Sequence, residues 1–343
     1  MRKLLNTLYV TNPDSYLARD GENVVVRIGN EIKFRMPIHN IEGIVSFGYI
    51  GASPSLMGLC AERGVALTFL TETGRFLASV QGPLKGNILL RKQQYKVAES
   101  EAESLLISQN LIVGKISNSR AVLQRAIRDH DVLAKNPEMK RSVDYLSRQI
   151  EKAQRVKSLD QLRGLEGDSA KCYFGVFDFL ILKNKDDFYF HGRTRRPPLD
   201  NVNALLSFLY TMLTHDIRAA LETVGLDPAA GFFHQPRPGR PSLALDLIEE
   251  LRAYLVDRLV LSAINLKQVD GKGFVLKESG GVVMNQDTRK EIIAIWQKRK
   301  KEIITHPFLN EKIEIGLLPY VQALLLARHL RGDLGCYAPF FWR

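Results

Sequence analysis

The chain has 343 residues, of which 45% are hydrophobic and 25% are charged, a balance typical of a folded protein and unlike that of a disordered one. This length exceeds the needs of one small core, so we expect two domains. Lys plus Arg number 48 against 37 for Asp plus Glu, which gives a net charge of +11. A positive charge of this size favours a polyanionic binding partner such as nucleic acid. An anionic membrane surface fits less well, because no basic amphipathic anchor stands out in the sequence.

The cysteines are few and widely spaced: Cys60, Cys172 and Cys336. With no CxxC pair among them, neither a zinc knuckle nor a disulfide framework is expected. The N-terminus lacks the apolar run of a signal peptide, and no stretch reaches the roughly 18 apolar residues of a membrane span. We therefore expect a cytoplasmic protein without membrane association.

The first 84 residues alternate turn signals with short runs rich in β-branched and aromatic residues. The runs are Leu8–Val10, Tyr16–Arg19, Val24–Ile28, Ile32–Pro37, Ile41–Phe47, Val65–Leu70 and Phe76–Val80, the last two flanking a Thr73-Gly74 turn. This rhythm predicts a β-meander. A short helix is expected from Ser53-Pro54 to Arg63, with Gly64 as its stop. We expect His39 to be structural, because an isolated histidine rarely acts without partners.

The sequence pattern changes from one typical of strands to one typical of helices across Gly82–Asn87. We therefore predict an N-terminal β-rich domain (1–84), a linker (85–90) and a larger helical domain (91–343), which is an α+β fold. Most basic residues of the helical stretch Leu89–Val156 are expected to be solvated, although some could follow a phosphate backbone. Farther on, Glu166 lies in a Gly-Leu-Glu-Gly step ahead of an apolar helix expected over Cys172–Leu182.

The rest of the chain is organised around residues 225–252. A helix is expected to stop at Gly225, His234 follows an apolar step, and a basic, proline-rich loop with Arg237 and Arg240 leads to Ser242, a candidate N-cap. The next helix carries Asp246, Glu249 and Glu250, whose i, i+3, i+4 spacing puts at least two carboxylates on one face. An imidazole with carboxylates suits a hard divalent cation. Alternatively, the acids only complement the helix dipole and the histidine only packs or caps.

Two further basic segments lie outside that stretch. Arg193, Arg195 and Arg196 form a cationic loop before a helix that Asp200 can cap and that runs to Val224. On it, Asn203, Ser207 and Tyr210 line one stripe, which faces either solvent or a site. After a β-hairpin over Lys272–Met284, a helix capped by Asp287 ends with Lys298, Arg299, Lys300 and Lys301. These cations either complement the helix end or bind nucleic acid.

The chain closes with a helix expected over Leu317–Arg331 and an aromatic tail that contains Tyr337, Phe340, Phe341 and Trp342. The tail could pack on its own domain or bind a partner. No internal repeat and no low-complexity tract are evident in the sequence.

Taken together, these motifs resemble the CRISPR adaptation integrase family, the first CRISPR-associated protein, over essentially the whole length. The resemblance rests on Arg195-Arg196 through Asp200, the Asn203/Ser207/Tyr210 stripe, Gly225-Leu-Asp-Pro228 leading to His234, and Asp246 with Glu249 and Glu250. The tail YAPFFWR is similar to members that accompany type I-C systems.

The resemblance implies roles for individual residues. Glu166, His234 and Glu249 would bind one manganese or magnesium ion, with Asp246 as a neighbouring catalytic carboxylate. The division of roles between Asp246 and Glu249 stays open. Asn203, Ser207 and Tyr210 would line the site. The residues expected to contact DNA are Arg193, Arg195, Arg196, Arg237, Arg240, Lys298, Arg299, Lys300 and Lys301.

The implied activity is insertion of short duplex DNA into a CRISPR repeat, by attack of a 3′-hydroxyl on a phosphodiester, with endonuclease activity when water attacks instead. The implied partners are double-stranded DNA, a second copy of the chain and the small second CRISPR-associated protein. A catalytically silent DNA-binding subunit and an RNA-binding module are the alternatives.

Overall fold

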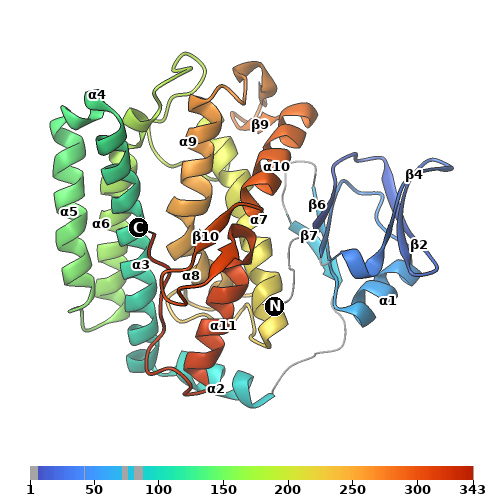
Figure 1. Ribbon diagram of the computed structural model, residues 1–343, viewed down its shortest axis with the longest axis horizontal. Coiled ribbons are helices and arrows are strands. Elements are labelled where there is room, and N and C mark those ends of the chain that lie inside the picture. The colour runs from blue at the N-terminus through green and yellow to red at the C-terminus, as the bar shows by residue number, and fades with distance from the viewer. Residues whose placement is uncertain (1–6, 42, 72–75, 81–87, 343) are drawn as a thin grey trace. The chain divides into compact units, whose positions relative to one another are not determined.

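The computed structural model describes residues 7–41, 43–71, 76–80 and 88–342 (Figure 1). The chain forms two compact units, one from Met1–Lys85 with Gln286–Lys301 and one from Gly86–Asn285 with Glu302–Arg343. The boundary segment Gly82–Asn87 and the Thr73-Gly74 turn lie outside the described residues. The division into 1–84, 85–90 and 91–343 therefore stays a prediction, although residues 88–90 already belong to a helix.

The first unit holds two small sheets rather than one meander. An antiparallel sheet contains β2 (Ser15–Asp20), β3 (Asn23–Ile28) and β4 (Glu31–Pro37). A second sheet has the order β1 (Thr7–Val10), β5 (Gly43–Phe47), β6 (Ala66–Leu70) and β7 (Phe76–Val80). Because β1, β5 and β6 run parallel, a crossover must join β1 to β5 and another must join β5 to β6. The β2–β4 sheet and η1 (Ile38–Asn40) lie between β1 and β5 in the sequence, and α1 (Pro54–Arg63) lies between β5 and β6.

Helix α1 begins and ends as its sequence predicts. The Ser53 hydroxyl accepts a hydrogen bond from the Leu56 amide at 3.2 Å, and Gly64 takes a left-handed conformation at the C-terminus. The buried side of the helix contributes Leu56 and Leu59 to the apolar core of this unit. The remaining element of the unit is α10 (Gln286–Lys300), in which Asp287 lies within the first turn and does not precede the helix as expected.

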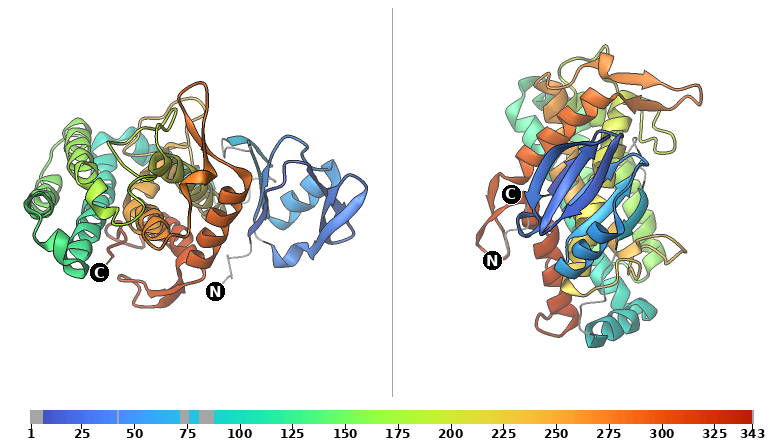
Figure 2. Two further views of the ribbon diagram at one scale, coloured as in Figure 1. Left: turned by 90° about the horizontal axis from the view of Figure 1, so that it is seen from above. Right: turned by 90° about the vertical axis from the view of Figure 1, so that its right-hand side faces the viewer.

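The second unit is largely helical: its long helices stand side by side in Figure 1, and the left view of Figure 2 looks along them from above. The central helix, α3, packs against α5, α6 and α8, while α7 packs against α8 and α11. The helices are α2 (Ile88–Glu99), α3 (Glu101–Asp129), α4 (Asp131–Ala134), α5 (Pro137–Ala153), α6 (Leu159–Gly175), α7 (Asn201–Val224), α8 (Ser242–Leu251), α9 (Arg258–Asn265) and α11 (Leu318–Leu330).

Shorter elements join these helices. A π-helical segment, η3 (Arg252–Asp257), links α8 to α9. The remaining elements are η2 (Phe177–Leu180), η4 (Gly271–Gly273), η5 (Ile315–Leu317), β8 (Phe274–Leu276), β9 (Val282–Met284), β10 (Ile303–Thr305) and β11 (Lys312–Glu314). The β8–β9 hairpin and the α11 helix confirm two sequence predictions. Among the described residues, no helix is both long and apolar enough to cross a membrane.

Helix ends in this unit follow local signals in some places only. Asp200 caps α7 by accepting a 2.7 Å hydrogen bond from the Asn203 amide, and left-handed Gly225 ends it, as predicted. The prediction that Ser242 is an N-cap is wrong. Ser242 is the first residue of α8, and its hydroxyl donates instead to the Gln235 carbonyl at 3.2 Å.

The prediction of a helix over Cys172–Leu182 is also wrong, because α6 begins earlier, at Leu159, and ends at Gly175. Its N-terminus is capped by the Ser158 hydroxyl, which accepts a hydrogen bond from the Gln161 amide. Tertiary packing of the buried residues Leu162 and Tyr173 stabilises the helix across its internal glycines. Glu166 consequently projects from the middle of a helix rather than from a loop ahead of one.

The C-terminal tail packs on the helical unit. Gln322 Nε2 and the Tyr337 hydroxyl donate to Glu250 Oε1 at 2.9 and 2.5 Å, and the Phe340 amide donates to Glu250 Oε2 at 2.8 Å. The guanidinium of Arg258 lies 3.9 Å from the ring centroid of Trp342, a cation–π contact. Of the two expectations for the aromatic tail, packing on its own domain is the one observed.

Candidate active site

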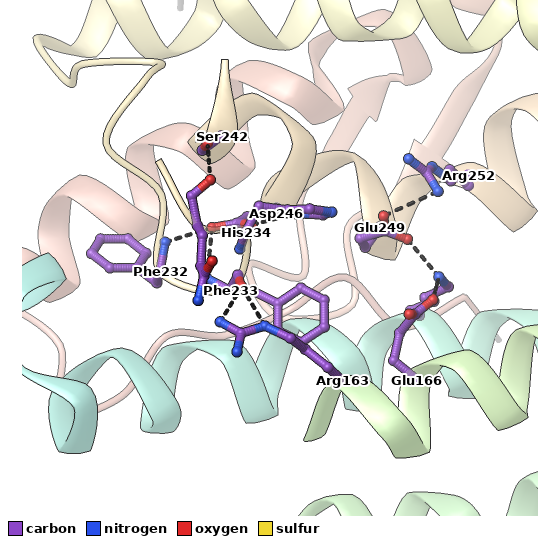
Figure 3. Close-up of polar contacts among 11 residues, drawn as sticks. Arg163, Glu166, Phe232, Phe233, His234, Ser242, Asp246, Glu249 and Arg252 are labelled. Carbon is purple, nitrogen blue, oxygen red and sulfur yellow. Dashed lines mark hydrogen bonds and ion pairs between the residues drawn. The ribbon is translucent and has the colours of Figure 1, made fainter. Parts of the chain in front are cut away.

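Two glutamates from different helices face one lysine at the centre of the helical unit. Lys115 projects from α3, Glu166 from α6 and Glu249 from α8. The Lys115 ammonium forms an ion pair with Glu166 Oε1 and lies 2.7 Å from Glu249 Oε2. The exposed fractions of the three side chains are 12%, 22% and 4%, so the cluster is largely removed from water. Figure 3 shows Glu166 and Glu249 approaching each other from their separate helices.

Glu249 also pairs with Arg252 from the π-helical segment, at 3.0 Å between Nη1 and Oε1. Burial alone would raise the pKa of Glu249, but Arg252, Lys115 and His234 together outweigh burial and lower the pKa to about 2. The carboxylate is therefore ionised throughout the neutral range. An ionised, buried oxygen donor is what a divalent cation requires.

His234 is oriented by Asp246. The Asp246 Oδ1 atom lies 2.7 Å from His234 Nδ1 and also accepts a 2.9 Å hydrogen bond from the His234 amide. Because an ionised carboxylate can only accept, a neutral His234 must carry its proton on Nδ1. Its Nε2 lone pair is then available to a metal, in the carboxylate–histidine arrangement common around metal ligands. Figure 3 shows His234 and Asp246 adjacent.

The other oxygen of Asp246 fixes the loop before His234. Its Oδ2 atom accepts hydrogen bonds from the amides of Phe232 and Phe233 at 2.6 and 3.0 Å. A Cβ atom on Gly231 would lie 2.8 Å from the same oxygen and 2.7 Å from the Ser242 backbone, so only glycine fits there. All four contacts of Asp246 hold the histidine loop in place.

A second buried network lies beside the first. Asp257 Oδ1 accepts a 2.5 Å hydrogen bond from the Tyr210 hydroxyl, and Oδ2 accepts one from Tyr173 at 3.1 Å. Burial raises the pKa of Asp257 to about 6, although both tyrosines and the nearby arginines favour its charged form. The guanidinium of Arg252 lies 5.1 Å from the Tyr210 ring centroid and so connects this network to Glu249.

The polar stripe on α7 faces inward. Arg193 donates to Asn203 Oδ1 at 2.6 Å and to Ser207 Oγ at 3.0 Å, and its guanidinium lies 5.2 Å from the Tyr210 ring centroid. Asn203 is fully buried. Ser207 and Tyr210 are partly buried, so the stripe faces the interior of the helical unit rather than open solvent.

A pocket opens beside these groups within the helical unit. It is lined by the site residues Lys115, Glu166, Tyr210, Glu249, Arg252 and Asp257, and by Arg195 from the arginine-rich loop. The pocket therefore combines carboxylates with cations and aromatic walls. A phosphate group could meet positive charge there.

The donor set fits a divalent cation chemically. Glu249 Oε2 is buried and lies 2.7 Å from the Lys115 ammonium, but among the described residues it has no partner with hydrogen-bond geometry. The two glutamates and the unprotonated Nε2 of His234 would supply the mixed oxygen and nitrogen ligands that such an ion accepts. In the described part of the chain, no three acidic, histidine or cysteine side chains already converge into a metal cage.

The basic residues predicted to contact DNA differ in accessibility. Arg195, Arg196, Arg237, Lys298 and Lys301 are exposed, while Arg193, Arg240 and Arg299 are partly buried. Lys300, on the buried side of α10, is only 4% exposed and is the least accessible of these residues. Its contact with DNA stays a prediction.

Three important residues were missed by sequence analysis. Lys115 was grouped with solvated cations, yet it lies inside the apolar run Leu111–Ile116, which signals an inward position. Asp257 is similarly surrounded by apolar residues in Tyr254–Val260. Arg252 carried no local signal, because its role depends on the π-helical turn that follows α8.

These features define an α+β protein whose larger, helical part holds an acidic site with one oriented imidazole. A family model described as CRISPR associated protein Cas1 matches residues 8–298. A CRISPR-associated endonuclease Cas1 from Chlorobaculum tepidum is 52% identical over 343 residues, covering 100% of both chains. The chain belongs to the Cas1 family of CRISPR-associated endonucleases.

Solved structures support the fold. A CAS1 protein from Thermotoga maritima aligns with a TM-score of 0.82 at 22% identity, covering 95% of this chain and 97% of that one. A casposase bound to integration product aligns with a TM-score of 0.83 at 21% identity, covering 98% and 94%. A chain of a Cas6-RT-Cas1–Cas2 complex aligns at 0.82 and 21% identity, covering 100% of this chain and 36% of its own.

Proposed function

We propose that this chain is a divalent-metal-dependent DNA integrase with endonuclease activity, which joins the 3′-hydroxyl of a short duplex to a phosphodiester in a CRISPR repeat. One observation carries the proposal: Glu166 and Glu249 face the same cation while Asp246 orients His234 nearby. Membership in the Cas1 family supports the nuclease part. The fold shared with a casposase bound to integration product is consistent with strand transfer.

Glu166, Glu249 and Nε2 of His234 would hold one Mn²⁺ or Mg²⁺ ion. Asp246 is then a positioning residue, because its oxygens are already used by His234 and by two backbone amides. When bound, the metal would neutralise charge on the phosphoryl oxygens and activate the attacking hydroxyl. The low pKa of Glu249 keeps that ligand ionised without a proton leaving first.

The protein itself supplies no covalent nucleophile in this proposal. Burial and the neighbouring Asp257 raise the pKa of Tyr210 well above its ordinary value, and its hydroxyl donates to Asp257. Tyr210 therefore stays protonated and serves as a wall of the site. Arg195 and Arg196 are exposed and would hold the DNA backbone by charge alone.

The proposed partners are double-stranded DNA, a second copy of the chain and the small protein Cas2, with all of them in the cytoplasm. The alignment with a chain of a Cas1–Cas2 complex supports the Cas2 proposal. The tail sequence Tyr337–Arg343 favours a type I-C system.

The test is strand transfer by the purified chain with Cas2. A 3′-hydroxyl duplex is incubated with a supercoiled plasmid carrying a CRISPR repeat, in Mn²⁺, in Mg²⁺ or in EDTA. We expect a metal-dependent joined product that His234→Ala abolishes. The matched control is His130→Ala, because His130 is exposed ahead of α4 and its side chain caps nothing.

Two outcomes would contradict the proposal. DNA binding without product in either metal, with a Cas2 preparation shown to be competent, would favour a catalytically silent DNA-binding subunit. Stronger binding of RNA than of duplex DNA of equal length would favour an RNA-binding module.

A further inference from the structure

Lys115 is the cation that both glutamates face, yet the proposed function assigns it no role of its own. Its ammonium contacts both glutamates assigned to the metal, and only 12% of its side chain is exposed. It emerges between Gly114 and Ile116 on α3, the helix that packs against both α6 and α8. A single lysine thus links the two helices that carry the glutamates.

The charges of the cluster are balanced without a metal. Glu166 and Glu249 contribute two negative charges, and Lys115 and Arg252 contribute two positive ones. Without Lys115, two largely buried carboxylates would face each other with only Arg252 to offset them, and like charges at low dielectric repel strongly. A divalent cation in the same place would repel the ammonium.

We propose that Lys115 is the internal counter-ion of the site: it holds Glu166 and Glu249 together before the metal enters and leaves at least one of them when the metal binds. This inference rests on the proposed function for the identity of the ligands. Lys115 is a positioning residue in this role, and metal entry is an exchange of one cation for another. Metal affinity is lowered by the cost of displacing the lysine.

The first test measures thermal unfolding of the full chain in EDTA. Lys115→Met should lower the melting temperature markedly, whereas Lys115→Arg, which keeps the charge, should largely retain it. In a Glu166→Gln background the cost of Lys115→Met should shrink, because one of the two repelling charges is gone. An equal cost in both backgrounds would mean that Lys115 only packs, and would overturn the proposal.

The second test measures Mn²⁺ binding directly, from the electron paramagnetic resonance signal of the free ion. Lys115→Met should bind Mn²⁺ more tightly, by on the order of tenfold, the size of a typical coupling between contacting groups. Arg120→Met is the matched control. This variant also removes a cation from α3, but the Arg120 guanidinium donates to the Ser147 hydroxyl rather than to a carboxylate. The affinity for Mn²⁺ should therefore not change.

The outcomes separate this inference from the proposed function. Unchanged or weaker Mn²⁺ binding by Lys115→Met, with binding by the unaltered chain still dependent on Glu166 and His234, would overturn the counter-ion role alone. If neither Glu166→Gln nor His234→Ala changes the affinity for Mn²⁺, the assignment of these residues as metal ligands is overturned. The unfolding comparison in EDTA would then still decide whether Lys115 links the glutamates. If Lys115→Met fails to fold, the Lys115→Met/Glu166→Gln double variant should recover folding, and its failure would count against the proposal.

Discussion

Glu249 and Glu250 are neighbours on α8, and both are buried, yet they lie in opposite electrostatic environments. Glu249 faces Lys115 and Arg252, and its pKa falls to about 2. Among the described residues, the partners of Glu250 are neutral donors, Gln322, Tyr337 and the Phe340 amide, and burial raises its pKa to about 7. Cations can outweigh the cost of burying a carboxylate, whereas three neutral hydrogen bonds here do not. The helix thus presents one carboxylate paired with cations and, beside it, one paired with neutral donors.

The largest effect expected from this contrast is on activity. Glu249→Gln should reduce strand transfer below detection, because the amide carries no charge to hold a divalent cation, while Glu250→Gln should retain it. Both proteins are compared in the same plasmid assay, with circular dichroism to verify folding. Equal loss in the two variants would show that the environments differ less than their contacts indicate.

The next effect is on stability as a function of pH. The pKa of Glu250 is about 7 in the folded chain against 4.5 for an ordinary glutamate, so the folded state binds its proton more tightly. The stabilising contribution is complete below pH 4.5 and is lost as the pH rises through 7, a change of about 3 kcal/mol. In denaturant titrations with EDTA, Glu250→Gln should flatten this decline between pH 5 and 8. A decline as steep as that of the unaltered chain would contradict the assignment.

A smaller effect is expected from Asp246, which acts through His234. Asp246→Asn should weaken Mn²⁺ binding by roughly 10- to 100-fold, the usual cost of losing a carboxylate that orients a metal-binding histidine. The charge of Glu249 is untouched, so some binding and activity should remain. Complete loss of Mn²⁺ binding would instead make Asp246 a ligand and would reverse the proposed division of roles.

The smallest effect concerns exposed cations away from α8. Arg196→Ala should lower the slope of log affinity for duplex DNA against log salt concentration by about one, as expected for one lost phosphate contact. The control is Arg148→Ala, an exposed arginine on α5. Filter binding at several salt concentrations distinguishes them, and equal slopes for both variants would remove Arg196 from the interface.

A structural feature can be predicted from the sequence when the residues that determine it are close together in the chain, and not when they are far apart. The ends of α1 and α7 follow from the adjacent Ser53, Gly64, Asp200 and Gly225, because capping is local. The parallel pairing of β1 with β5 is a long-range contact, and the alternating runs that suggested a meander cannot encode it. The same holds for Ser242, whose hydroxyl bonds back across the proline-rich loop.

The candidate site shows the same limit. The resemblance brought together Glu166, His234 and Glu249 from distant positions, but composition and spacing alone marked only the stretch around His234. Lys115 and Glu166 are 51 residues apart, and no periodicity relates them. Asp257, the last residue of the π-helical segment, accepts hydrogen bonds from Tyr210 and Tyr173, which lie on other helices far away in the sequence.

The route of the chain has a practical consequence. The polypeptide leaves the helical unit after Asn285, contributes α10 to the first unit and returns at Glu302. A fragment ending at Lys85 would therefore lack one of the helices of its own unit, and the remainder would carry that helix without its strands. No single cut yields two intact modules, so exchanging the β-rich unit between relatives would require two junctions to be grafted together.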